Sequence, residues 1–267
     1  MAVAGAAARS ALDAALHACR IGASTRDVAD AARRVIDAGE GIVLFEGYPA
    51  DAERPFPDVA CVCVNDEVVH GVPGSRELFA GDLVTVDVGV RVGAWCGDVA
   101  DSVVVGRGAA GGPGDQAQQL VDATRAATRA AIDHIRPGVW WSEAVEAAVA
   151  AAGPFAFVPG YVGHAIGREL HEPLRVLFVT DNGEPIKRGG PHDFQLWPGM
   201  CFTVEPILAA ECGQSRPPRI VASEDGWTVR LAEGGLAAQV EETVAVTAEG
   251  VRVLTARRKE ASRSVNA

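Results

Sequence analysis

Two segments of the chain repeat one short pattern: a glycine, three variable residues, then threonine, valine and an acid. They are GDLVTVD at 81–87 and GMCFTVE at 199–205. In both segments the acid follows an apolar run with strand character. The repeat predicts two related halves, each of which presents a carboxylate at an equivalent place on a strand.

The elements predicted before and after a Gly/Pro-rich stretch come in the same order, two helices and then strands. Ahead of it, helices are predicted at 3–19 and 26–38, the second with Ser24 and Thr25 as candidate caps. The predicted strands of this part cover 58–64, 82–90 and 99–105. The stretch itself, GRGAAGGPG at 106–114, is the best candidate for a linker.

Beyond the linker the pattern begins again. Helices are predicted near 116–134 and 142–152, the latter capped by Ser142. The polar segment 181–194 is interpreted as a surface loop. The predicted strands lie near 201–208, 218–222, 226–231 and 236–247. The sequence therefore predicts an α+β fold with pseudo-halves at about 1–107 and 115–255, in a single domain over 1–267 with a charged tail at 256–267.

Composition limits the classes of partner. A formal charge of -11 argues against nucleic-acid binding, which needs a basic face. The six cysteines include the C-x-C pair Cys61 and Cys63 but no C-x-x-C pair, which is typical of reduced cytosolic thiols. The first residues are amphipathic, unlike a signal peptide or a membrane span. We expect a soluble cytoplasmic protein that binds neither nucleic acid nor membrane.

Five residues that can ligate metal fall in apolar strand or turn contexts: Asp87, Asp98, His164, Glu205 and Glu241. Each alone could be a turn former, a surface charge or a structural histidine. Asp87 and Asp98 flank a glycine-containing reversal, which predicts a hairpin that brings their carboxylates together. Four acids and one imidazole carry too much negative charge for one ordinary zinc site, but they suit a pair of divalent metals bridged by carboxylates.

The stretch LAAQVEETVAV at 236–246 places two acids side by side. Alternation along a strand would send Glu241 and Glu242 to opposite faces. Glu241 then lies in a core segment, where a carboxylate needs a partner. Glu242 can point away from any metals and lie in water.

Six motifs occur in an order that is specific for one family. They are VNDEVVHGVPG at 64–74, VDVGVRVGAWCGD at 86–98, GHAIGRELHEP at 163–173, FTVEP at 202–206, DGWTVR at 225–230 and AAQVEET at 237–243. Together they resemble the type I methionine aminopeptidases over nearly the whole chain. The resemblance implies the pita-bread fold, in which two pseudo-symmetric halves form a curved antiparallel sheet flanked by helices.

The resemblance also implies a role for each of the five ligand candidates. Asp87 would be a bidentate ligand of one metal, and His164 and Glu205 would bind the second. Asp98 and Glu241 would bridge the two ions, which could be cobalt, manganese, iron or zinc. Glu205 would also shuttle a proton during hydrolysis.

Further residues are expected to contact substrate. By the resemblance, His70 and His171 would hydrogen-bond the scissile amide and the developing oxyanion, although a histidine in a turn can simply cap a loop. Cys61, Leu170 and Trp227 fall at positions that line the methionine pocket, and Trp227 could equally be a packing residue. Leu170 stands where an aromatic residue is usual, and the loop at 45–58 also departs from the family.

The expected activity is removal of the initiator methionine from nascent proteins whose second residue is small. The partners would be the N-terminal peptides of nascent chains. The protein itself is expected to be a monomer that contacts the ribosome at most transiently. Two alternatives remain: a related aminopeptidase or Xaa-Pro dipeptidase with the same metals, and a metal-free binding module. Two further departures from the family, Ala165 for a glycine and Glu242 for a histidine, lie beside proposed ligands.

Overall fold

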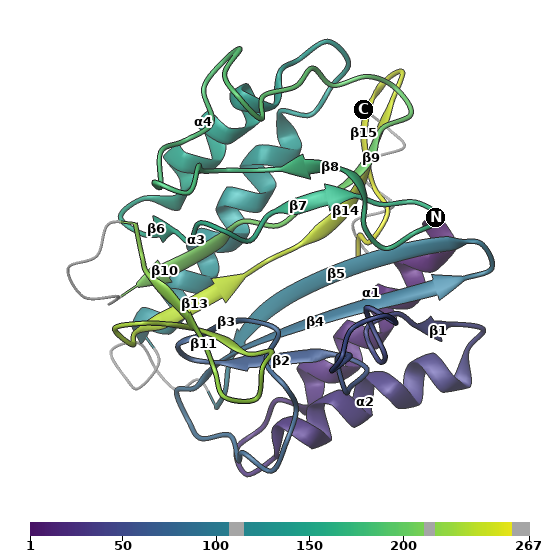
Figure 1. Cartoon of the computed structure of the whole chain (residues 1–267), viewed down its shortest axis with the longest axis vertical. Coiled ribbons are helices and arrows are strands. Elements are labelled where there is room, and N and C mark those ends of the chain that lie inside the picture. The colour runs from purple at the N-terminus through teal and green to yellow at the C-terminus, as the bar shows by residue number, and fades with distance from the viewer. Residues whose placement is uncertain (107–114, 211–216, 258–267) are drawn as a thin grey trace.

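The computed structural model describes residues 1–106, 115–210 and 217–257 (Figure 1). It confirms an α+β fold in which every strand pair is antiparallel among these residues. Most of the predicted linker, and the predicted tail beyond Arg257, lie outside the described residues.

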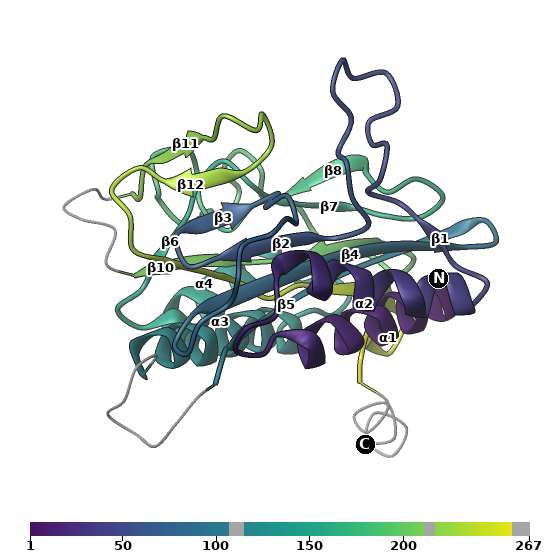
Figure 2. The same ribbon diagram turned by 90° about the horizontal axis from the view of Figure 1, so that it is seen from below.

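The N-terminal part packs two helices against one sheet. The helices are α1 (Ala2–Ala18) and α2 (Thr25–Ala38), and Figure 2 shows both along one face of the long strands. The sheet contains β1 (Ile42–Val43), β2 (Cys61–Val64), β4 (Leu83–Val92) and β5 (Trp95–Val104), with β4 pairing all three others.

Alternation along β4 separates the core from the site. Val84, Val86 and Val88 are fully buried and belong to the same apolar cluster as the alanines of α1. Successive side chains of a strand leave on opposite faces, so Thr85 and Asp87 point away from these helices. The sheet thus buries valine on one side and presents a carboxylate on the other.

Two more helices, α3 (Asp115–Asp133) and α4 (Trp141–Ala152), cover the sheets of the C-terminal part (Figure 1). A five-stranded sheet has the order β15-β14-β9-β7-β8, and two three-stranded sheets have the orders β13-β10-β6 and β11-β12-β3. The bounds are β3 (Glu67–Val69), β6 (Ala156–Phe157), β7 (Gly163–Ala165), β8 (Glu172–Val176), β9 (Cys201–Val204), β10 (Ile207–Ala210), β11 (Ile220–Ala222), β12 (Val229–Leu231), β13 (Leu236–Gln239), β14 (Glu242–Thr247) and β15 (Gly250–Val253).

Helix capping is predicted correctly at one helix and wrongly at another. Ser24 is the N-cap of α2, where its Oγ accepts from the Asp27 amide at 3.1 Å and Asp27 accepts from the Ser24 amide at 2.8 Å. Ser142 does not cap α4, which begins at Trp141. The Asp193 carboxylate, from the predicted surface loop, instead accepts from the Ser142 amide at 2.9 Å. A residue distant in sequence thus satisfies the helix terminus.

Two predicted strands are each divided in the structure. The strand predicted at 201–208 is interrupted at Glu205 and Pro206, and the strand predicted at 236–247 is interrupted at Val240 and Glu241. β9 pairs with β14 in one sheet, and β10 pairs with β13 in another. The two segments therefore pass from one sheet to the other at neighbouring positions. Pro206 has no amide proton for a continuous ladder. Two acids therefore lie at matching interruptions.

Among the described residues, no helix combines the length and hydropathy needed to cross a bilayer.

Candidate metal centre

The β4–β5 hairpin brings the first two acids together, as predicted. Asp87 is opposite Ala100 and Asp98 is opposite Gly89, so the two acids are diagonal neighbours on the same face. The Thr243 hydroxyl fixes the backbone of Asp98, accepting from its amide at 3.1 Å and donating to its carbonyl at 2.7 Å. The hairpin is thereby tied to β14.

The other three ligand candidates come from the C-terminal part. His164 lies on β7, and its amide donates to Thr203 Oγ1 at 2.9 Å. Glu205 follows β9 and accepts from Thr203 Oγ1 at 2.6 Å and from Gln239 Nε2 at 3.2 Å. The Glu241 amide donates to the carbonyl of Ala100 on β5 at 2.8 Å. The strand interruptions therefore turn both glutamates toward the hairpin.

These side chains surround a space that suits a cation. His164 Nε2 is 3.7 Å from Asp98 Oδ2 and 3.8 Å from Glu205 Oε1, which is too far for hydrogen bonds. Asp98, His164 and Glu241 each offer a ligand atom within 4.8 Å of the other two. Asp87 Oδ1 and Glu241 Oε1 are buried without a hydrogen-bond partner among the described residues. Buried carboxylate oxygens without partners are costly, and a divalent cation would satisfy them.

The carboxylates repel each other when no cation is present. Burial, and then the neighbouring acids, raise the pKa of Asp87 and Glu241 well above the ordinary value. Burial raises the pKa of Asp98 to about 6 although His164 lowers it, and burial raises the pKa of Glu205 to about 7. Protons would therefore occupy part of the cluster at neutral pH unless a cation displaces them.

Two further histidines face the same cavity, whose volume is about 310 Å³. His70 has a left-handed backbone with φ 57°, and its ring packs edge-on against Tyr161 at 5.3 Å between centroids. His171 Nδ1 lies 2.6 Å from the Tyr48 hydroxyl. Burial lowers the pKa of both histidines, and the pKa of His171 falls to about 4, with electrostatic repulsion from the neighbouring histidines as the next cause. Both rings are accordingly neutral near neutral pH.

One wall of the cavity is apolar. Cys61 and Leu170 are buried there with Phe45 and Phe56, and Trp227 packs against them. The Phe56 ring meets Trp227 edge-on at 5.4 Å between centroids, and Trp227 Nε1 donates to the Arg54 carbonyl at 3.0 Å. The divergent 45–58 loop thus supplies two aromatic rings beside the aliphatic Leu170.

All ten residues that the sequence singles out line this one cavity: Cys61, His70, Asp87, Asp98, His164, Leu170, His171, Glu205, Trp227 and Glu241. Sequence reasoning missed Phe45, Tyr48, Phe56, Tyr161 and Gln239, which also line it. The only signal in the sequence for Phe45, Tyr48 and Phe56 was that three aromatic residues fall within the short loop at 45–58.

A family model described as metallopeptidase family M24 matches residues 1–248. The chain belongs to metallopeptidase family M24. Two M24 relatives are methionine aminopeptidase B of Synechocystis, 34% identical over 238 residues, and methionine aminopeptidase 1 of Mycobacterium tuberculosis, 35% identical over 265 residues. These matches cover 88% and 96% of this chain and 80% and 91% of the relatives. The chain is therefore a metallopeptidase, and its Asp/His/Glu cluster is a candidate site for a divalent metal.

Solved structures give the same fold. Methionine aminopeptidase from Thermotoga maritima has a TM-score of 0.81 at 31% identity, with 96% of this chain and 95% of that chain covered. Prolidase from Pyrococcus furiosus has a TM-score of 0.64 at 21% identity, with 96% of this chain and 63% of that chain covered. The second likeness concerns the fold alone. The pita-bread fold expected for an M24 peptidase is confirmed.

Glu242 points away from the metal centre but does not lie in water, which corrects the expectation from the sequence. Its Oε1 accepts from Arg9 Nη2 at 2.6 Å, and the side chains of Arg9 and Glu242 are only 6% and 19% exposed. The Thr255 hydroxyl donates to the other carboxylate oxygen. Arg9 Nε also donates to the Thr255 carbonyl at 2.7 Å. The acid in place of a histidine thus belongs to a buried ion pair between α1 and β14.

Proposed function

We propose that this M24 peptidase removes N-terminal methionine from polypeptides whose second residue is small. The observation that carries the proposal is that one cavity joins an oxygen-rich cluster of candidate metal ligands to an apolar wall. The relatives named methionine aminopeptidase support the same reading. The likeness to a prolidase does not favour a dipeptidase, because at 21% identity it concerns the fold alone.

The proposed ligands are the five clustered residues. Asp87, Asp98, His164, Glu205 and Glu241 would together hold two divalent ions. Two ions neutralise four buried acids better than one, and the oxygen-rich set suits manganese, iron, cobalt or zinc. When bound, divalent ions supply Lewis acidity at the scissile carbonyl and lower the pKa of water.

The remaining steps rest on side chains of the chain itself. Glu205, held by Thr203 Oγ1 and Gln239 Nε2, would take a proton from the attacking water and return it to the leaving amine. His171, neutral and hydrogen-bonded at Nδ1, would present Nε2 to the developing oxyanion. His70 would hold the scissile amide from the opposite side. The apolar wall at Cys61 and Leu170 would receive the methionine side chain.

A free α-amine is what distinguishes the substrate of an exopeptidase from internal peptide bonds. A neutral α-amine offers a nitrogen lone pair to a divalent cation, whereas the lone pair of an internal amide is delocalised into its carbonyl. We further propose that residues 1–267 act as a single catalytic domain, and that the enzyme works as a cytoplasmic monomer which meets N-terminal peptides of nascent chains, at most transiently at the ribosome.

A peptide panel with metal reconstitution tests the proposal. The purified chain, stripped of metal and reloaded with manganese, iron, cobalt or zinc in turn, is expected to release methionine from Met-Ala-Ser. N-acetyl-Met-Ala-Ser is the matched control, since it lacks only the free amine. Rapid cleavage of Ala-Pro peptides with no release of methionine would overturn the methionine assignment.

A further inference from the structure

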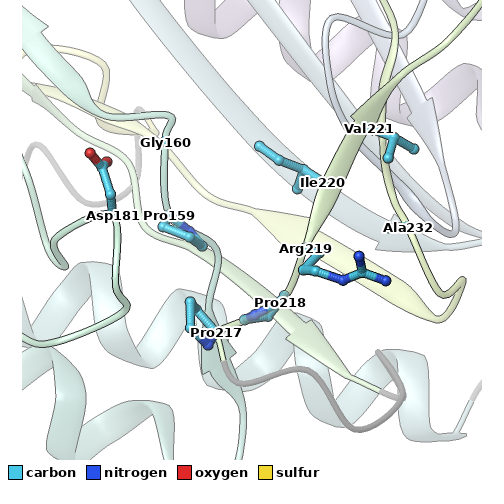
Figure 3. Close-up of a pocket in the computed structure, with 9 residues that line it drawn as sticks. All are labelled: Pro159, Gly160, Asp181, Pro217, Pro218, Arg219, Ile220, Val221 and Ala232. Carbon is cyan, nitrogen blue, oxygen red and sulfur yellow. The ribbon is translucent and has the colours of Figure 1, made fainter.

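A second hollow adjoins the cavity of the metal centre. It is an open groove of about 590 Å³ between the Pro159–Gly160 segment and the Pro217–Val221 segment (Figure 3). Gly160 lines both the groove and the cavity of the metal centre. The two hollows therefore share this glycine as a common wall residue.

Glycine is suited to the junction. Gly160 has φ +95°, a conformation that side-chain-bearing residues rarely adopt, and a Cβ there would lie 3.5 Å from Ile220 Cδ1 across the groove. Figure 3 shows the Ile220 side chain projecting from β11 toward this segment. Any larger residue at 160 would narrow the passage.

One side of the groove is a strand with a free edge. β11 contributes Ile220 and Val221 to the lining, and its sheet has the order β11-β12-β3. Within the described part of the chain, no strand pairs with the outer edge of β11. An unpaired strand edge offers main-chain donors and acceptors to an extended peptide, independently of the sequence of that peptide.

The arrangement of the cavity gives the direction of the substrate. Its apolar wall, with Phe56 and Leu170, would hold the first side chain, and the carboxylate cluster would face the α-amine. Tyr161 and Gly160 also line the cavity, and Gly160 lines the groove as well. A substrate longer than the cavity therefore has a continuous surface to follow.

We propose that this groove binds the substrate from its third residue onward, in extended conformation, with main-chain pairing to the outer edge of β11. The inference rests on the proposed aminopeptidase function and adds a site outside the cavity. At about 3.3 Å per residue, a strand of this length pairs three or four substrate residues. The groove is proline-rich, with Pro159, Pro217 and Pro218, and it also carries the charged side chains of Asp181 and Arg219. Main-chain pairing along β11 would accept many substrate sequences.

Substrate length is the first test. With all C-termini amidated to keep charge constant, the metal-loaded enzyme is expected to cleave Met-Ala-Ser-Val-Thr-Val with a kcat/KM about fivefold or more above that for Met-Ala-Ser. In Ile220→Lys the gain should be lost, so that the hexapeptide is cleaved with a kcat/KM within about twofold of that for the tripeptide in the same variant. Ile21→Lys, an exposed isoleucine that does not line either hollow, is the matched control and should retain the gain.

N-methylated hexapeptides test the pairing on the unmodified enzyme, so the proposal does not depend on a variant that folds. Only alternate amides of a strand face its partner. Of two hexapeptides, one N-methylated at residue four and the other at residue five, one should therefore lose the gain and the other should keep it. Equal kcat/KM for the tripeptide and the hexapeptide would refute substrate binding in the groove. If neither methylation reduced the gain, main-chain pairing with β11 would be refuted. Failure to cleave any methionyl peptide would instead refute the proposed function, and this inference with it.

Discussion

The hydroxyl of Tyr48 and Nδ1 of His171 lie 2.6 Å apart, although they are 123 positions apart in sequence. Burial raises the pKa of Tyr48, so the phenol keeps its proton, and His171 is neutral. A phenol that donates to Nδ1 leaves the proton of the imidazole on Nε2, the nitrogen proposed to meet the oxyanion. With the phenol as donor, the arrangement that the proposed role of His171 requires, the 45–58 loop selects the tautomer of a proposed catalytic histidine.

Tyr48→Phe removes this hydroxyl and keeps the ring. We expect kcat on Met-Ala-Ser to fall by about fivefold, in line with the loss of one hydrogen bond, with little change in KM. Tyr161→Phe, which removes a hydroxyl from the same cavity without touching His171, is the control. Equal effects of both variants would mean that His171 does not depend on Tyr48.

Glu241→Gln tests the proposed bridge. An amide cannot serve as an anionic bridge, so metal content should fall and hydrolysis of Met-Ala-Ser should decrease by more than about 100-fold. Circular dichroism should show a folded chain, because the change removes one of four mutually repelling acids. Normal turnover with a full complement of metal would contradict the assignment of five ligands.

The stability of the metal-free protein should fall as pH rises through the pKa of these acids, whereas acids with a lowered pKa make a folded protein less stable as pH falls. Glu205 titrates near its ordinary value of 4.5 when unfolded and at about 7 when folded, and Asp98 moves from 3.8 to about 6. The native state then binds more protons, so the stability conferred by protonation is complete below about pH 4 and is lost as pH rises through about 7.

Thermal melts of the stripped protein across this range measure the effect. The Tm should fall as pH rises, and saturating divalent metal should abolish the fall by displacing the protons. A metal-free Tm that increases steadily from pH 4 to pH 7 would mean that the acids are ionised without a cation.

The buried pair of Arg9 and Glu242 gives a prediction about stability with little change in activity. Glu242→Gln leaves the Arg9 guanidinium without its counter-charge, which should lower the free energy of unfolding by about 3 kcal/mol. Glu46→Gln breaks an exposed ion pair with Arg33 and should cost less than about 1 kcal/mol. Metal content and kcat should remain near wild type in both, because Glu242 points away from the cavity.

The proposed metal ligands could be picked out of the sequence because each belongs to a local motif. The hairpin around Asp87 and Asp98 follows from the glycine-containing reversal, and the repeat that ends in Glu205 marks the matching strand. The interruptions at Glu205 and Glu241 could not be predicted, because each strand changes partner there, and partner choice depends on long-range packing. Hydrophobic periodicity alone predicts that both strands continue.

The supporting residues were missed for a different reason. Thr203 and Gln239 hold Glu205 by single side-chain hydrogen bonds; both fall inside motifs quoted from the sequence, but a motif does not show which partner a side chain binds. Phe45 and Phe56 reach the cavity from a loop with no periodic pattern. Short strands such as β3 and β7, with three residues each, are also too brief to leave a periodic signal.

The contacts of Arg9 bear on how the molecule opens. One guanidinium holds α1 to Glu242 on β14 and to the carbonyl of Thr255, beyond β15. The strand next to Glu241 therefore cannot separate from the first helix without exposing a buried charge. The amides of α1 and β14 should consequently exchange with solvent through one shared opening, which makes the edge of the metal centre part of the same cooperative unit as the start of the chain.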